Sequence, residues 1–112
     1  MGEIKEITDA LLKFRDERDW EQFHDSKNLA VAISIEAAEL NELFLWKDLM
    51  DSENVNIEKI QDELADIFAF GFLLAHRHNL DVKNIVLKKI KKNAEKYPVE
   101  KAKGTAKKYD EL

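Results

Sequence analysis

Apolar residues recur every three or four positions in four segments of the chain, which is the period of an amphipathic helix. The first segment is Glu3 to Arg18, where Ile4, Ile7, Leu11 and Phe14 form the apolar stripe. The second runs from about Asn28 to Trp46, the third from a cap at Asn54 or Asn56 to about His78, and the fourth from Val82 to about Tyr97. Short polar connections separate these segments. The pattern predicts an all-α fold, an antiparallel four-helix bundle.

The end of the fourth segment marks the expected boundary between a helical domain and a C-terminal tail. Asp81 is a good helix N-cap, and Pro98 stops the helix because proline cannot continue it and biases Tyr97 away from helical geometry. We therefore expect one helical domain over residues 1–98 and a Lys-rich C-terminal tail over residues 99–112.

The third segment is apolar almost all round over residues 64–75, LADIFAFGFLLA. A helix of this kind has to be covered on all sides. Four helices of one chain of 112 residues can hardly cover it, so we expect a homo-oligomer.

Composition narrows the class of protein. The chain has no cysteine, which excludes disulfides, thiolate metal sites and cysteine nucleophiles, and its 3 glycines and 1 proline argue against turn-rich β folds and Gly-rich phosphate loops. No long apolar stretch is free of charge, and acidic residues interrupt the first ten positions. We expect a cytoplasmic protein with no membrane span and no signal peptide.

Four carboxylates lie in or beside these apolar runs. Glu36 lies within AVAISIEAAEL, with Glu39 one turn on, and Asp66 lies within ELADIFAFGF, with Glu63 one turn before it. The pattern is E-x-x-E, 23 intervening residues, then E-x-x-D. A spacing of three places each pair on one helix face, and a short connection lets the two helices lie antiparallel with the pairs facing.

The sequence offers these four side chains almost no cation. Their i+4 positions are apolar, and the one local cation is Lys59, four residues before Glu63. Clustered like charges beside a core are costly unless something cationic binds. A hard divalent ion suits carboxylate ligands, and no Glu has His at i+3, so the E-x-x-H signature of di-iron bundles is missing. We therefore expect Mg²⁺, with Mn²⁺ as a substitute; the alternative is a solvated acidic helix edge.

The E-x-x-E and E-x-x-D pairs resemble the motif of the MazG-like all-α nucleoside triphosphate pyrophosphohydrolases. The likeness extends to RDWEQFHDSKNL, ELFLWK, KNAEKYP and the KKYDEL end, which are similar to the dCTP pyrophosphatase branch. The resemblance implies that residues 1–98 form such a domain. It implies Mg²⁺-dependent hydrolysis of a (deoxy)nucleoside triphosphate between the α and β phosphates, and a dimer or tetramer with sites between subunits.

In this interpretation Glu36, Glu39, Glu63 and Asp66 are the catalytic and metal-binding residues, with Glu63 either a ligand or the group that orients the attacking water. Relatives often carry Tyr four residues after the motif Asp, where this chain has Phe70, so that hydroxyl is missing. Spacing alone does not say which carboxylate acts as a base.

A nucleobase needs a flat apolar partner and hydrogen bonds at its edge. Trp20, Phe23 and His24 lie in a polar connection that is not obviously core, and Trp46 follows Glu39 on the same helix face. The alternatives are a lid that packs on the bundle for Trp20 and a plain surface residue for His24.

Phosphates need cations and hydrogen-bond donors. Lys27 and Asn28 precede the second helix and can reach a phosphate, while the resemblance favours Asn93, Lys96 and Tyr97 on the fourth. The alternatives are a capped core amide for Asn93 and a solvated lysine face. The tail residues Lys107, Lys108 and Tyr109 either fold over a site or stay loose.

The net charge of −5 conceals two regions of opposite sign. Residues 36–66 carry 10 acids and 2 bases, whereas residues 82–112 carry 4 acids and 10 bases. An acidic hairpin suits a metal ion and a basic fourth helix suits phosphate, while the overall charge argues against binding polymeric nucleic acid.

The favoured function is hydrolysis of dCTP or a modified dCTP to the monophosphate and pyrophosphate, which would clean the nucleotide pool. Two alternatives remain. The same fold could act on another nucleotide, such as dUTP or phosphoribosyl-ATP, or the chain could be a non-catalytic helical association module.

Overall fold

The structure is a computed structural model that describes residues 2–112. It contains helices and turns, with no strand among the described residues, so the predicted all-α class is confirmed. In chain order the elements are α1 (Glu3–Glu17), the 3₁₀ helix η1 (Glu21–Phe23), α2 (Ser26–Glu42), α3 (Leu49–Ser52), α4 (Ile57–Arg77), α5 (Val82–Lys96), α6 (Val99–Ala102) and the 3₁₀ helix η2 (Tyr109–Glu111). No described helix is both long and apolar enough to cross a membrane.

Side-chain caps set where three of the long helices begin. Asp25 accepts a hydrogen bond from the backbone N–H of Asn28 at 2.7 Å, so α2 starts two residues earlier than the sequence predicts. Of the two predicted caps of α4, the structure uses Asn56, whose side chain accepts from the N–H of Glu58 at 2.8 Å. Asp81 caps α5 as predicted. Each cap satisfies a backbone donor that has no partner within its helix.

The second helix ends earlier than its apolar pattern indicates. Hydrogen bonds of the i→i−3 kind replace the helical ladder after Glu42, and Trp46 adopts a φ of +62°. A left-handed backbone is uncommon for a residue other than glycine and ends a helix. Residues 43–46 therefore form a turn that leads to α3, rather than the last turn of α2.

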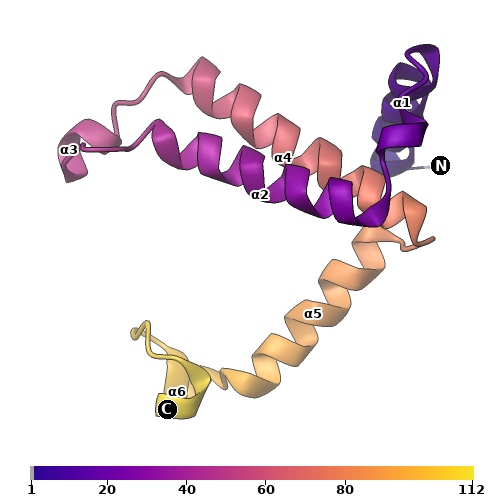
Figure 1. Cartoon of the computed structure of the whole chain (residues 1–112). Helices are drawn as coiled ribbons and strands as arrows, with labels where there is room; N and C mark the ends of the chain where they lie inside the picture. The colour runs from indigo at the N-terminus through magenta and orange to yellow at the C-terminus, as the bar shows by residue number, and fades with distance from the viewer. Residues whose placement is uncertain (1) are drawn as a thin grey trace. The chain divides into compact units, whose positions relative to one another are not determined.

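The chain divides into two compact units, one up to Asn79 and one from Leu80 to Leu112, and each is described by itself. In the first unit α2 and α4 lie side by side and run in opposite directions, and α1 also contacts α4 (Figure 1). The open end of this hairpin is closed by Ser26 and His78, whose Oγ and Nε2 lie 2.8 Å apart. The predicted antiparallel pairing of the second and third helical segments is thus what the first unit shows.

Little of the apolar surface is buried. Among residues 2–112 the buried core consists of Leu29, Leu73 and Ala75. On α4, Leu64 is 39% exposed and Phe68 is 55% exposed, within the run that the sequence predicts to be covered. The chain alone leaves this face uncovered.

The second unit consists of α5, α6 and η2. A short helix and a 3₁₀ turn thus lie in the region predicted as a tail. The four-helix bundle, the homo-oligomer and the division into residues 1–98 and 99–112 stay predictions.

Candidate metal centre and nucleotide site

Two acidic pairs face each other across the α2–α4 hairpin. Glu36 and Glu39 lie on α2, and Glu63 and Asp66 lie on α4; the two members of each pair are three positions apart in the sequence. One carboxylate oxygen from each of Glu36, Glu39 and Glu63 lies within 4.8 Å of the other two. The antiparallel hairpin thus brings together, from two helices, side chains that are up to 27 positions apart in the sequence.

Asp66 lies at the margin of this cluster. It is exposed and falls outside the group of oxygens within 4.8 Å, although its charge contributes to the raised pKa values of Glu36 and Glu63. The structure therefore brings three of the four predicted ligands into one group and places the fourth one turn along α4.

Burial and like charge act together on two of these side chains. Burial first, and then the hydrogen bond and the charge of Glu39, raise the pKa of Glu36 to about 7. Burial, and next the hydrogen bond and the charge of Glu39, also raise the pKa of Glu63. Both shifts have the direction that removal from water and neighbouring carboxylates produce.

Two oxygens of the cluster are buried without a partner. Oε2 of Glu36 and Oε2 of Glu63 are shielded from solvent, and neither accepts a hydrogen bond. Lys59, the one local cation in the sequence, forms no ion pair with Glu63, and within residues 2–112 no ion pair involves any of the four carboxylates.

Buried acceptors without donors are rare because each one forfeits its hydration. A group of carboxylate oxygens, two of them buried without a partner, suits a hard divalent cation, which prefers oxygen ligands. The residues present therefore fit a metal ion, and Glu36, Glu39 and Glu63 could hold it.

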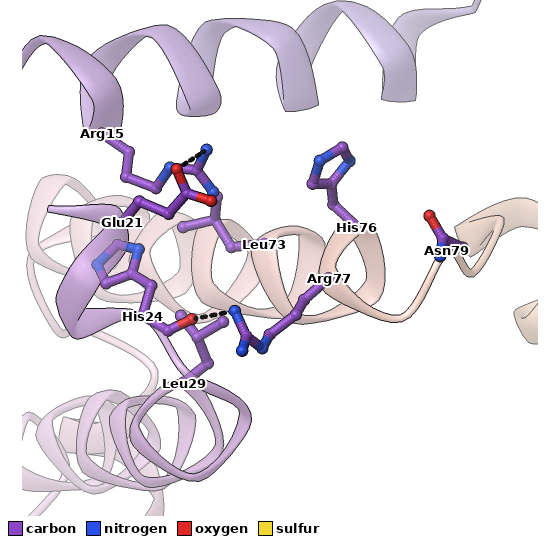
Figure 2. A pocket seen from close by; sticks show the side chains of 8 residues that line it. All are labelled: Arg15, Glu21, His24, Leu29, Leu73, His76, Arg77 and Asn79. Atoms are coloured by element: carbon purple, nitrogen blue, oxygen red, sulfur yellow. Dashed lines mark hydrogen bonds and ion pairs between the residues drawn. The ribbon is translucent and has the colours of Figure 1, made fainter. Parts of the chain in front are cut away.

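A pocket lies at the other end of the hairpin from α3, and its volume is about 250 Å³. Figure 2 shows side chains from α1, the η1 segment, α2 and α4 around it. Its lining residues are Arg15, Glu21, His24, Leu29, Leu73, His76, Arg77 and Asn79. The apolar part is the buried core pair Leu29 and Leu73, and the remaining lining residues are polar or charged.

His24 connects this pocket with the acidic hairpin. Its ring meets Phe70 edge-to-face with the centroids 6.3 Å apart, and Phe70 lies one turn beyond Asp66 on α4. Burial, and next the charge of Arg15, lower the pKa of His24 and favour its neutral form. Its Nδ1 is buried without a partner. A neutral imidazole can donate at one nitrogen and accept at the other, which suits the edge of a heterocycle.

Two arginines near His24 come from different helices. Arg77 donates a hydrogen bond to the His24 carbonyl at 3.3 Å, and the Arg15 guanidinium lies 3.7 Å from a carboxylate oxygen of Glu21 (Figure 2). Arg15 also forms an ion pair with Asp16 at 2.8 Å. The sequence pattern did not identify either arginine as a site residue, because each is an ordinary charged position near a helix end. Only their position close to His24 in the folded structure identifies them.

The other predicted residues of this region have different surroundings. Trp20 is 43% exposed, and its ring meets Phe14 edge-to-face at 5.8 Å, so one side packs on α1 and the other stays open. Asn28 donates from its side chain to the Phe23 carbonyl at 3.1 Å, which braces the segment that carries His24. Lys27 is exposed.

Trp46 is the most exposed aromatic residue of the described chain, with 94% of its surface accessible. It follows α2 in the turn with the left-handed backbone, on the way to α3. A fully exposed indole on an uncommon backbone conformation has no role within the chain's own packing. In the second unit, Asn93, Lys96 and Tyr97 lie at the end of α5.

Fold and site together define a class: an all-helical protein that pairs two helices around a carboxylate cluster suited to a divalent metal. A sequence model of the MazG-like family matches residues 31–112, which include all four carboxylates. The chain belongs to the MazG-like family, so the resemblance that the sequence suggested is confirmed.

Individual relatives agree with this assignment. The rat protein named dCTP pyrophosphatase 1 is 35% identical over 114 residues, covering 97% of this chain and 67% of the relative. The human protein of the same name is 36% identical over 116 residues, with the same coverage. The crystal structure of a pyrophosphatase from Archaeoglobus fulgidus superposes with a TM-score of 0.82 at 36% identity, covering 88% of this chain and 94% of that one. The prediction of an enzyme of this family is therefore confirmed.

Proposed function

We propose that the protein hydrolyses a nucleoside triphosphate, dCTP or a modified dCTP, to the monophosphate and pyrophosphate with the help of Mg²⁺. The observation that carries the proposal is the group of three carboxylates from two helices with two buried, partnerless oxygens. The relatives named dCTP pyrophosphatase 1 support this substrate.

The four carboxylates of the acidic cluster have different roles in this proposal. Glu36 and Glu39 would hold the ion, with Asp66 as a further ligand at the exposed side of the cluster. When bound, Mg²⁺ neutralises phosphate charge and acidifies a water, and Mn²⁺ can replace it. Glu63 would either ligate the ion or orient the water that attacks phosphorus.

The remaining predicted residues bind the nucleotide. Trp20 and His24 contact the base, with His24 at its edge. Trp46 lies at the α3 end of the hairpin, away from His24, so its open indole meets the base from a second subunit. Lys27 and Lys96 bind phosphate oxygens, and Asn93 and Tyr97 contact the substrate from α5. Asn28 acts through its bond to the Phe23 carbonyl, which orders the segment next to the base.

We further propose a homo-oligomer, a dimer or tetramer, built by the α2–α4 hairpin. The exposed apolar side chains of that hairpin support it, because monomeric proteins rarely leave a large apolar patch in water. In this proposal residues 1–98 form the catalytic domain, arranged as the four-helix bundle, and residues 99–112 the tail. The cytoplasmic location stays a prediction.

Hydrolysis of a panel of deoxynucleoside triphosphates in oxygen-18 water tests the proposal. We expect pyrophosphate release, label in the monophosphate, and dependence on Mg²⁺. Glu39→Gln is expected to lower kcat/KM by about 100-fold or more, because it removes one charge at the centre of the cluster. Glu42→Gln, the next acidic residue of α2, is the matched control and keeps parent activity.

Three outcomes contradict parts of the proposal. If Glu39→Gln keeps the activity of the parent, the assignment of the catalytic site is wrong. If the protein prefers dUTP, the proposed substrate is wrong. Absence of hydrolysis together with no thermal stabilisation by Mg²⁺ and nucleotide favours the association module, since a ligand that binds the native state raises its stability.

A further inference from the structure

The segment after α5 folds back onto the end of that helix. Pro98 follows the last turn of α5 and opens the short helix α6, and Gly104 then takes a φ of +78°. A left-handed residue reverses the chain direction, and glycine adopts this conformation without steric cost. The reversal brings Tyr109, 12 positions further along the sequence, back to Tyr97.

Tyr109 contacts two of the three residues at the end of α5 that are proposed to touch the nucleotide, Lys96 and Tyr97. The Tyr97 and Tyr109 rings meet edge-to-face with their centroids 6.2 Å apart and their planes at 84°. The Nζ of Lys96 lies 4.9 Å from the centroid of the Tyr109 ring, within the range of a cation–π contact. The Tyr109 ring thus contacts an aromatic side chain, Tyr97, and a cationic one, Lys96.

The charge of Lys96 remains available to a ligand. Glu95 is its neighbour in sequence and Glu100 lies four residues on, yet within residues 2–112 no carboxylate lies in ion-pair distance of Lys96. A contact with the face of an aromatic ring restricts the long side chain without neutralising it, whereas an ion pair would compete with phosphate.

We propose that Tyr109 is a positioning residue, which holds the Lys96 ammonium and the Tyr97 ring in place for the triphosphate. The inference rests on the proposed function. In this proposal the C-terminal tail orders the phosphate-binding Lys96 before the substrate binds. A lysine that is already ordered loses less conformational entropy on binding, and this gain appears as tighter substrate binding.

Steady-state kinetics of the full chain with Mg²⁺ and its best deoxynucleoside triphosphate test the proposal. The variants are Tyr109→Ala, Tyr109→Phe, Lys96→Ala and the double variant Tyr109→Ala with Lys96→Ala. We expect Tyr109→Ala to raise KM by about 3- to 10-fold with kcat little changed. Tyr109→Phe keeps the parent KM, because both contacts use the ring and not the hydroxyl.

The double variant separates positioning from other roles. If Tyr109 acts through Lys96, its loss adds little once Lys96 is absent, so the two effects on KM are not additive. Gly104→Ala perturbs the same reversal independently, since the φ of +78° strains any other residue, and is expected to raise KM as Tyr109→Ala does. Lys101→Ala, an exposed position of α6, is the matched control and leaves KM unchanged.

Several results overturn the inference. The inference fails if Tyr109→Ala keeps the KM of the parent, or if Tyr109→Phe raises KM as much as Tyr109→Ala does. It also fails if the effects of Tyr109→Ala and Lys96→Ala on KM are fully additive. Failure of this inference and failure of the proposed function give different results: if the parent hydrolyses no triphosphate, both fall, whereas an active parent with an indifferent Tyr109 removes this inference alone.

Discussion

At the scale of single residues, the acidic cluster is costly when it is left without a cation. Glu36 and Glu63 each have one buried oxygen without a hydrogen-bond partner, and Glu39 adds a third charge within 4.8 Å of both. Burial and like charge raise the pKa of Glu36 to about 7, against 4.5 for an ordinary glutamate. The native state therefore binds a proton at Glu36 more tightly than the unfolded chain does.

This shift makes the stability of the metal-free protein depend on pH. Because the folded pKa lies above the unfolded one, the Glu36 contribution is present below about pH 4.5 and is lost as pH rises to about 7. We expect the Tm of chelator-treated protein to fall from about pH 4.5 to about pH 7, and millimolar Mg²⁺ to reduce the fall. Thermal unfolding by circular dichroism at each pH measures it.

Glu36→Gln is the control, because it removes the titrating group and should flatten the pH dependence relative to the parent. His24 acts in the opposite direction, since its lowered pKa favours the neutral ring and lowers stability in acid, so the comparison is between variant and parent. The same slope in the parent, in Glu36→Gln and with Mg²⁺ would contradict this electrostatic account.

The sequence was sufficient to find the cluster but not the neighbours of His24. Glu36 and Asp66 stand out because the i+4 positions after them are Leu40 and Phe70, where a surface carboxylate usually has a cation. Arg77 stands in no unusual sequence context. Its contact with the His24 carbonyl spans 53 positions, and no local pattern encodes that distance.

At the scale of elements, caps and backbone geometry decided the helix boundaries. Apolar periodicity located the long helices because each buries a stripe of side chains. It placed the end of α2 four residues too late, at Trp46 instead of Glu42, since the apolar residues of the following turn continue the same pattern. The choice between Asn54 and Asn56 as the cap of α4 also needed the structure.

Asn56→Ala should destabilise the protein by about 1 kcal/mol, because the N–H of Glu58 loses its acceptor at the start of α4. Chemical unfolding at one fixed protein concentration measures the change in the free energy of unfolding. Asn41→Ala, at an exposed position inside α2, is the matched control, and alanine is neutral or favourable there. Equal effects of the two substitutions would show that the Asn56 cap contributes nothing specific.

At the scale of the whole molecule, the main feature is how little of the described chain is buried. Three apolar side chains form the core, while Phe68 on α4 is 55% exposed and stacks on Phe72 with the ring centroids 6.3 Å apart. Such a core is small for a chain of this length, and burial of apolar surface is the main source of stability. A second copy that covers the hairpin would supply what the single chain lacks.

Phe68→Asp should therefore dissociate the proposed oligomer, because it places a charge within the surface to be buried. Light scattering coupled to size exclusion should give a multiple of 13.0 kDa for the parent and a mass nearer to 13.0 kDa for the variant. Gln61→Asp adds the same charge at an exposed polar position of α4 and should leave the mass unchanged. A monomeric parent would contradict the oligomer directly.

The sequence by itself determined the helical class, the four long helical segments and the acidic pairs, because these follow from periodicity and from charges without local partners. It also carried the family resemblance. The tertiary structure decided which carboxylate oxygens meet, which of them lose their hydrogen-bond partners, and how Tyr109 returns to Lys96 and Tyr97. The physical reason is distance along the chain. A helical repeat is set by neighbours within four residues, whereas burial and the raised pKa of Glu36 arise only when separate helices come into contact.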